Sequence, residues 1–246
     1  MTVHIITYAT HEEGMFNKLV NNEYGVKVNV IGWGEKWQGF MHKVQRCNDY
    51  IKSFPENDIF IIIDGFDTII NSNNLDNCIK YFTESPYKVM YSKNIKNHNY
   101  GLEKVVFDYC RDEDIANCGM YMGYGKFLSI LLDDITTLSC KDDQVNVNSV
   151  CKKYGFLGID SHNYIFENML DKNKPSNAMF IQYPGTLTLS RLIRGLREYP
   201  QFFIIHLSLI FITLITLCIH FYCYKILAIL LIFIIILFAF SDYSCI

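Results

Sequence analysis

The sequence has little excess charge of either sign. Its 246 residues carry 22 Lys and Arg against 25 Asp and Glu, a net charge of -3, and no long basic run stands out. A protein that binds nucleic acid needs clustered cations to neutralise phosphates, so this composition argues against a nucleic-acid partner. The nine cysteines are scattered without a C-x-x-C pair. We therefore interpret them as reduced thiols that mostly fill space.

Apolar residues, in contrast, are abundant and unevenly distributed. Half of the residues are hydrophobic and 15% are aromatic, which excludes a disordered chain. From Phe202 to Phe240 the one charged residue is Lys225. Phe202–Tyr224 has the length with which a helix crosses a ~30 Å hydrocarbon core, and Ile226–Phe240 is either a second span or an interfacial segment. Residues 198–246 are therefore predicted to form a membrane anchor, a single helix or a helical hairpin, in contact with lipid.

The residues before this anchor predict its orientation. Arg191, Arg194 and Arg197 precede the apolar stretch, and basic flanks tend to stay on the cytoplasmic side. The first residues have neither the basic region nor the apolar core of a signal peptide. We therefore expect a membrane protein that is anchored near its C-terminus and whose globular domain, residues 1–197, faces the cytosol.

Within residues 1–197, short apolar runs alternate with amphipathic stretches. Strands are expected over Val3–Thr7, Val26–Ile31, Ile59–Ile63, Lys88–Tyr91 and Met120–Tyr124, and helices over Phe40–Phe54, Leu75–Phe82, Lys126–Leu132 and Gln144–Tyr154. This alternation predicts one α/β domain with a mostly parallel sheet and helices on both faces. Open sheets of this kind bind ligands at the carboxyl ends of their strands.

One of these strand ends carries two acidic residues. The apolar run Ile59–Ile63 continues directly into Asp64-Gly65-Phe66-Asp67, a D-x-x-D motif. Two carboxylates in this position can hold a divalent cation together with substrate phosphates. Asp and Gly are also ordinary turn residues, so the motif alone leaves a purely structural turn open.

Several short motifs occur in order along the chain. They are Ile5–Thr10, an opening strand and turn; Val30–Gly39, similar to L-G-x-G-E-x-W-x-G; His42–Val44, similar to Q-K-V; the D-x-x-D motif; Asn117–Tyr124, similar to N-S-G-x-x-x-G-x; Asp142–Gln144, which reads D-D-Q; and Ile159–Phe166, similar to L-D-x-x-x-x-I-F. In this order they resemble the glycosyltransferase domain of procollagen lysyl hydroxylases and related collagen glycosyltransferases, a family of GT-A fold with a Rossmann-type sheet. The resemblance covers most of residues 1–187.

This resemblance implies an enzyme that moves a hexose, glucose or galactose, from UDP-glucose or UDP-galactose to a protein or glycan acceptor, such as hydroxylysine of a collagen-like protein. It implies that Asp64 and Asp67 hold Mn²⁺ or Mg²⁺, which assists departure of the UDP group. Thr7, Tyr8, Ala9, Lys43 and Phe66 are expected to contact the nucleotide, and Asn117, Asp142 and Asp143 to face the sugar or acceptor. One of these carboxylates would act as general base, although adjacent aspartates before a helix are also common capping residues.

The chain departs from the family pattern near the end of the domain. Gln182 stands where the family has a metal-binding His, and Leu187 stands where the family has a Lys. An amide oxygen is an uncharged ligand, so we expect Gln182 to complete the metal site more weakly than His would, and His162 could replace it only if the fold brings it close. The alternative function is a degenerate GT-A domain that binds nucleotide sugar or glycan as a membrane-tethered module.

Overall fold

The computed structural model of the chain describes residues 1–95, 106–184, 212–213 and 216. The arginines before the predicted anchor, and nearly all of the anchor itself, lie outside these residues. Within the described part, no helix is both long enough and apolar enough to cross a membrane. The membrane anchor and its orientation therefore stay predictions.

The centre of the domain is a six-stranded sheet in the order β2-β1-β3-β6-β5-β7. Its strands are β1 (Val3–Tyr8), β2 (Asn29–Ile31), β3 (Ile59–Ile63), β5 (Val89–Lys93), β6 (Ala116–Tyr124) and β7 (Leu157–Asp160). The pairs β1 with β2, β1 with β3 and β5 with β7 are parallel, whereas β6 runs antiparallel to both of its neighbours. The predicted α/β domain with a mostly parallel sheet is confirmed, with one reversed strand inside the sheet.

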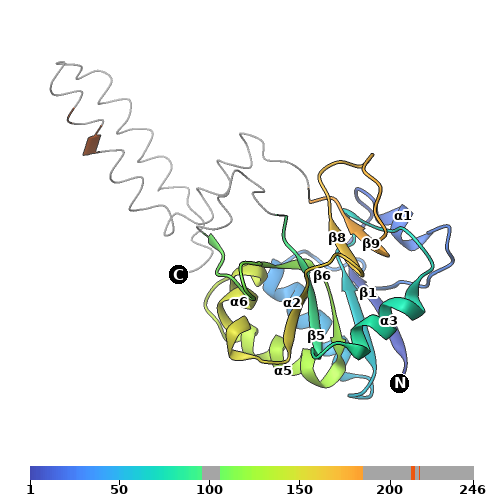
Figure 1. Cartoon of the computed structure of the whole chain (residues 1–246), viewed down its shortest axis with the longest axis horizontal. Helices are drawn as coiled ribbons and strands as arrows, with labels where there is room; N and C mark the ends of the chain where they lie inside the picture. The colour runs from blue at the N-terminus through green and yellow to red at the C-terminus, as the bar shows by residue number, and fades with distance from the viewer. Residues whose placement is uncertain (96–105, 185–211, 214–215, 217–246) are drawn as a thin grey trace.

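Helices cover this sheet on both faces (Figure 1). They are α1 (Phe16–Val20), α2 (Phe40–Lys52), α3 (Leu75–Glu84), α5 (Gly125–Thr136) and α6 (Asp143–Val150), the last continued by a 3₁₀ turn, Cys151–Lys153. Helices α2, α5 and α6 pack on one face, and α1 and α3 lie on the other. In α2 the buried residues Val44, Cys47 and Ile51 recur at helical spacing, which explains why this helix was evident from the sequence.

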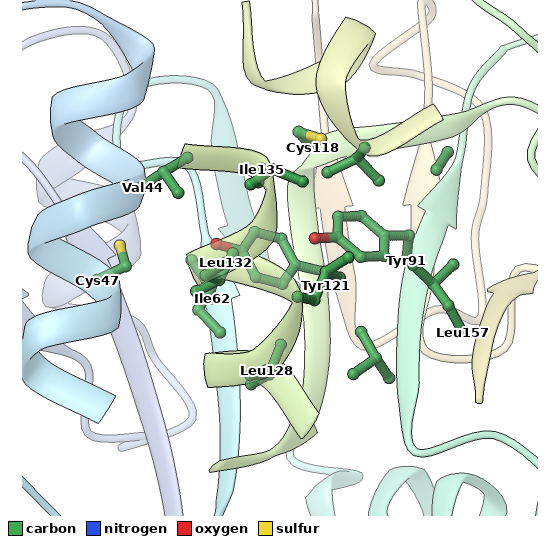
Figure 2. Packing of buried hydrophobic residues seen from close by; sticks show 14 of the residues in the cluster. Val44, Cys47, Ile62, Tyr91, Cys118, Tyr121, Leu128, Leu132, Ile135 and Leu157 are labelled. Atoms are coloured by element: carbon green, nitrogen blue, oxygen red, sulfur yellow. The ribbon is translucent and has the colours of Figure 1, made fainter. Parts of the chain in front are cut away.

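A separate hydrophobic core fills each face of the sheet. Figure 2 shows the first core, where Val44 and Cys47 of α2 and Leu132 of α5 point towards the sheet residues Tyr121 and Tyr91. The rings of these two tyrosines stack with their centroids 4.7 Å apart. The second core lies beneath α1 and α3. It contains isoleucines of β3 and methionines of β6 whose side chains lie on the face of the sheet opposite to the first core. Burial on both faces is the reason that β3 reads as a continuous apolar run.

A second, three-stranded sheet has the order β4-β9-β8, and the sequence analysis did not anticipate it. Its strands are β4 (Thr68–Ile70), β8 (Phe166–Asn168) and β9 (Phe180–Gln182). Strand β4 pairs antiparallel with β9, so that Thr68 faces Gln182. The N–H of Tyr183 donates to the backbone oxygen of Asp67 at 2.8 Å. This small sheet therefore places the end of the domain beside the D-x-x-D motif.

A disulfide joins Cys110 to Cys151, which corrects the interpretation of all cysteines as reduced thiols. Both residues are buried in the first core, and the bond ties the chain before β6 to the end of α6. Cys47, Cys78 and Cys118 are free and buried. Burial raises the pKa of Cys47 and of Cys78 to about 12, so these two thiols stay protonated at neutral pH.

Loss of this disulfide is expected to lower the stability of the domain. Its two cysteines are 41 residues apart, and closing a loop of that size stabilises a protein by about 3–4 kcal/mol through the unfolded chain. We expect a lower urea midpoint for the Cys110→Ala/Cys151→Ala variant, and a similar loss for the wild type in dithiothreitol. Dithiothreitol should lower the midpoint of the variant by less than it lowers the midpoint of the wild type. Equal midpoints for the reduced and oxidised wild type would contradict the assignment.

Candidate active site

A pocket of about 400 Å³ opens at the carboxyl ends of β1 and β3. Its walls come from the chain after each of these strands and from the start of α2. The lining residues are Tyr8, Thr10, His11, Glu13, Trp37, Phe40, Lys43, Asp64, Gly65, Phe66 and Asp67. Most of the residues that the sequence analysis assigned to the nucleotide and the metal therefore share one cavity, as the general rule for open α/β sheets predicts.

Thr7 and Ala9, however, lie beneath the pocket rather than along its walls. Both are fully or almost fully buried. A Cβ added to Gly65 would lie 3.0 Å from the Thr7 hydroxyl and 3.2 Å from the Ala9 methyl, so the turn of the D-x-x-D motif rests directly on these two residues. Of the three contacts predicted at the end of β1 and just after it, Tyr8 alone lines the pocket. Thr7 and Ala9 position the acidic turn.

Aromatic side chains form one side of the pocket. The rings of Tyr8 and Trp37 lie 5.9 Å apart, and Trp37 contacts Phe40 edge-on at 5.6 Å. Trp37 and Phe40 remain 46% and 47% exposed, which is unusual for large aromatic residues. Across the D-x-x-D turn, the ring of Phe66 lies 5.2 Å from that of His11. Such open aromatic faces can stack on a flat, partly apolar ligand.

Besides Gly65 of the D-x-x-D motif, five lining residues were not assigned to the site from the sequence. They are Thr10, His11 and Glu13, which come just after the end of β1, and Trp37 and Phe40, which lead into α2. The position of the first three after a predicted strand was a signal that could have identified them, because ligands gather at strand ends. Trp37 belongs to a Gly-rich segment with no helical or strand periodicity that would bury it, whereas Phe40 has the helical spacing of the residues that α2 buries and so gave no sign of exposure.

Asp64 and Asp67 converge on one atom, the amide nitrogen of Gln182. Nε2 lies 3.2 Å from Oδ2 of Asp64, and 3.0 Å and 3.2 Å from the two carboxylate oxygens of Asp67. Gln182 is only 3% exposed, and its Oε1 has no hydrogen-bond partner among the described residues. Gly119 of β6 makes room for this amide, since a Cβ there would collide with it. Three segments far apart in sequence thus meet at one point.

The two carboxylates are electrostatically strained as they stand. Burial, and then the charge of Asp64, raise the pKa of Asp67 to about 7. Burial also raises the pKa of Asp64, against the opposing effect of Lys43. When two partly buried carboxylates lie this close together, simultaneous ionisation of both is unfavourable. A positive charge between them would relieve both effects.

Lys43 links the acidic motif to α6. Its Nζ lies 3.2 Å from Oδ1 of Asp64 and 3.0 Å from Oδ2 of Asp143. Burial disfavours the charged form of this lysine, but Asp143 and Asp64 outweigh it and hold the pKa of Lys43 well above its usual value. The lysine therefore stays protonated and neutralises part of the charge of both carboxylates.

Comparisons with known proteins identify the domain. The family model of the PLOD GT domain matches residues 1–183. The chain belongs to this glycosyltransferase family. It is 22% identical, over 195 residues, to a multifunctional procollagen lysine hydroxylase and glycosyltransferase of Caenorhabditis elegans. That match covers 67% of this chain and 25% of the relative, so the chain spans about a quarter of the length of the curated relative.

A solved structure supports the GT-A fold. It is the crystal structure of a glycosyltransferase involved in the glycosylation of the major capsid of PBCV-1. It aligns with a TM-score of 0.50 at 12% identity, and covers 76% of this chain and 96% of that chain. At this identity the likeness concerns the fold alone. The predicted resemblance to the procollagen lysyl hydroxylase glycosyltransferase domain is thus confirmed by the family model and the curated relative.

The three residues that were expected to face the sugar or acceptor have three different surroundings in the structure. Asp143, the first residue of α6, is buried and bonded to Lys43. Asp142 caps the same helix and accepts a hydrogen bond from the N–H of Val145 at 2.9 Å. Asn117 accepts from the N–H of Gly119 at 2.9 Å and so shapes the strand against which Gln182 packs. None of the three lines the pocket among the residues that the structure describes.

The residues at the acidic motif fit the divalent cation that the PLOD GT family implies. Three carboxylate oxygens lie within 3.2 Å of one point, and oxygen ligands suit Mg²⁺ and Mn²⁺. The described residues contain no group of three or more His, Cys, Asp or Glu side chains placed to hold a metal. His162 therefore does not replace the family's His. Within the part of the chain that the structure describes, Asp64, Asp67 and Gln182 are the side chains placed to act as ligands.

Proposed function

We propose that this chain is a metal-dependent hexosyltransferase that moves glucose or galactose from a UDP-sugar to an acceptor hydroxyl. The observation that carries the proposal is the convergence of Asp64 and Asp67 in a pocket with an open aromatic side, at the carboxyl ends of the central strands. Membership of the PLOD GT family supports sugar transfer. The name of the nematode relative supports an acceptor of the collagen type, such as hydroxylysine.

The aromatic side of the pocket is suited to the base of the donor. Tyr8, Trp37 and Phe66 present ring faces or edges to the cavity, and a uracil ring stacks well on such surfaces. The volume of about 400 Å³ lies within the range of ordinary small-molecule sites. Stacking would orient the nucleotide so that its phosphates extend towards Lys43 and the acidic motif.

The polar end of the pocket would hold the phosphates. Asp64 and Asp67, with Gln182, are the residues that would bind Mn²⁺ or Mg²⁺. When bound, the cation supplies Lewis-acid stabilisation of the pyrophosphate leaving group. Lys43 adds a fixed positive charge beside Asp64, so it favours the negative charge that accumulates on UDP as the sugar leaves.

Asp143 is the best-placed candidate for receiving the acceptor proton. It is held by Lys43, next to the donor pocket, whereas Asp142 is committed to capping α6. A general base needs a fixed orientation towards the hydroxyl that it deprotonates, and the ion pair supplies that orientation. Asn117 acts indirectly, because it supports the backbone at Gly119.

The proposal predicts release of UDP from particular donors only. Full-length protein in detergent is incubated with Mn²⁺ or Mg²⁺ and each UDP-sugar in turn, and free UDP is measured. We expect release from UDP-glucose or UDP-galactose, and none in EDTA. Absence of release from every donor, with or without a collagen-like peptide, would overturn the enzymatic proposal.

One observation favours the alternative of a binding module without catalysis. The Gln182 amide already satisfies both carboxylates, as a permanently cation-free site would require. In that case UDP-sugars should bind without being cleaved, and EDTA should not weaken their binding. Calorimetry with UDP-glucose, run beside the release assay, separates the two functions.

The location of the domain bears on its acceptors. We propose anchoring through residues 198–246, for which the basic flank favours a cytosolic domain. The Cys110–Cys151 disulfide counts against that side, because disulfides persist mainly in oxidising compartments. Protease added to sealed vesicles decides the question: digestion places the domain in the cytosol, and protection places it with luminal, collagen-like acceptors.

A further inference from the structure

The side-chain amide of Gln182 is oriented as a hydrogen-bond donor towards the acidic motif. Its Nε2 faces the carboxylates of Asp64 and Asp67, which accept hydrogen bonds and cannot donate them when ionised. Its Oε1 is buried without a hydrogen-bond partner among the described residues. The donor end of the amide thus occupies the position where three carboxylate oxygens meet, which is also the position that suits a cation.

A cation at this point requires the opposite orientation. A metal ion repels an N–H group and binds the carbonyl end of an amide, so Oε1 has to face it. The last side-chain torsion of glutamine is broad and roughly two-fold, and a half-turn about it exchanges the oxygen and the nitrogen within nearly the same volume. Gly119 leaves space for the amide in both orientations, because it has no Cβ to contact either end.

We propose that Gln182 is a reversible ligand that turns its amide when the cation enters. In the cation-free site, Nε2 ties Asp64 to Asp67 and takes the place of the missing positive charge. In the loaded site, Oε1 binds the cation and completes a set of ligands made only of oxygen. The inference rests on the proposed cation dependence and adds the role of this residue, which is where the chain departs from the family.

An all-oxygen ligand set has a consequence for metal selectivity. Oxygen ligands suit both Mg²⁺ and Mn²⁺, but Mg²⁺ is the harder ion and binds an imidazole nitrogen less readily than Mn²⁺ does. A site with Gln182 should therefore bind Mg²⁺ nearly as well as Mn²⁺. A site with His at this position should distinguish them more strongly.

The test measures binding of the metal alone to the full-length protein. Mn²⁺ is titrated and the loss of the free-ion EPR signal is monitored, and Mg²⁺ affinity is obtained by competition. We compare Gln182→Leu, which keeps the approximate size and removes both polar ends, with Gln182→His. Gln45→Leu, an exposed position on α2, serves as the matched control, and Asp67→Asn tests the site itself.

Gln182→Leu lacks the proposed ligand, so it should bind Mn²⁺ roughly tenfold more weakly than the wild type, or weaker still. If the amide only blocks the site, the same variant should bind Mn²⁺ more tightly, and that result, or an unchanged affinity, would overturn the inference. Gln182→His should raise the ratio of Mn²⁺ to Mg²⁺ affinity, a ratio that incomplete folding does not change; an unaltered ratio would also count against direct ligation.

The two proposals fail in different ways. Wild-type protein that binds Mn²⁺ no better than Asp67→Asn would overturn the cation site and, with it, the role of Gln182. Binding that is lost in Asp67→Asn but unaffected by changes at Gln182 would overturn the role of Gln182 alone and leave the proposed function in place.

Discussion

Asp64→Ala and Asp67→Ala are each expected to abolish Mn²⁺-dependent binding of UDP while the domain stays folded. Each change removes a charged ligand at the end of a strand and leaves the hydrophobic cores intact. The loss should be roughly a hundredfold or more, because removing a ligand weakens binding at least as much as removing a residue that only supports one. Calorimetry with UDP, in Mn²⁺ and in EDTA, measures it. Unchanged affinity of both variants in Mn²⁺ would refute the metal assignment.

The stability of an Asp67→Asn variant gives an independent check. The pKa of Asp67 is raised to about 7 in the folded protein, above its unfolded value, so this group contributes stability at low pH that is lost as the pH rises towards 7. Asn cannot ionise and avoids that loss. Without divalent cations, the Tm of the variant minus the Tm of the wild type should therefore increase as the pH is raised from 5 to 8. A constant difference across this range would show that burial and the charge of Asp64 do not raise the pKa of Asp67 in the folded protein.

The second large effect is expected at Lys43. Lys43→Met removes the cation shared by Asp64 and Asp143 and leaves two carboxylates in a largely buried site. Breaking a buried ion pair in this way costs about 3–5 kcal/mol, and the partial exposure of Asp64 places the expected loss near the lower limit. Urea denaturation at pH 7 measures the loss. Much of it should be recovered at low pH, where the carboxylates are protonated.

A lysine on the same helix provides the control. Lys52 pairs with Asp133 at 2.7 Å, but both side chains are about half exposed. Exposed pairs contribute only about 0–1 kcal/mol, so Lys52→Met should leave the urea midpoint almost unchanged. Restoring stability to Lys43→Met by adding Asp143→Asn would confirm that the loss comes from the stranded carboxylate. Equal losses for Lys43→Met and Lys52→Met would contradict the link between the acidic motif and α6.

Local sequence patterns were sufficient to predict the longer helices and strands. The five-residue apolar run of β3 and the helical spacing of Val44, Cys47 and Ile51 in α2 appear in the structure at or close to the predicted bounds. Both patterns depend on which faces an element buries, and burial is recorded in the residue types themselves. The position of the D-x-x-D motif at the end of β3 could be predicted from the same pattern.

Short strands and strand direction were not predictable in this way. Strands β4, β8 and β9 contain three residues each, too few to show a period. Strand β6 was expected from its apolar residues, but its antiparallel direction depends on its partners on both sides. The three-residue strands matter most, because pairing of β4 with β9 is what carries Gln182 to Asp67.

The sequence by itself determined the α/β class, the family and the acidic motif, because these depend on local periodicity and on motifs in a fixed order. Tertiary structure alone decided which distant residues meet: Gln182 with Asp67 across 115 positions, Lys43 with Asp143, and Cys110 with Cys151. It also decided that Asp142 caps a helix while Asp143 pairs with Lys43. Such pairings arise when strands and helices pack. Closing the long loops between the paired residues costs conformational entropy, and the burial of many side chains offsets this cost, not the paired residues alone.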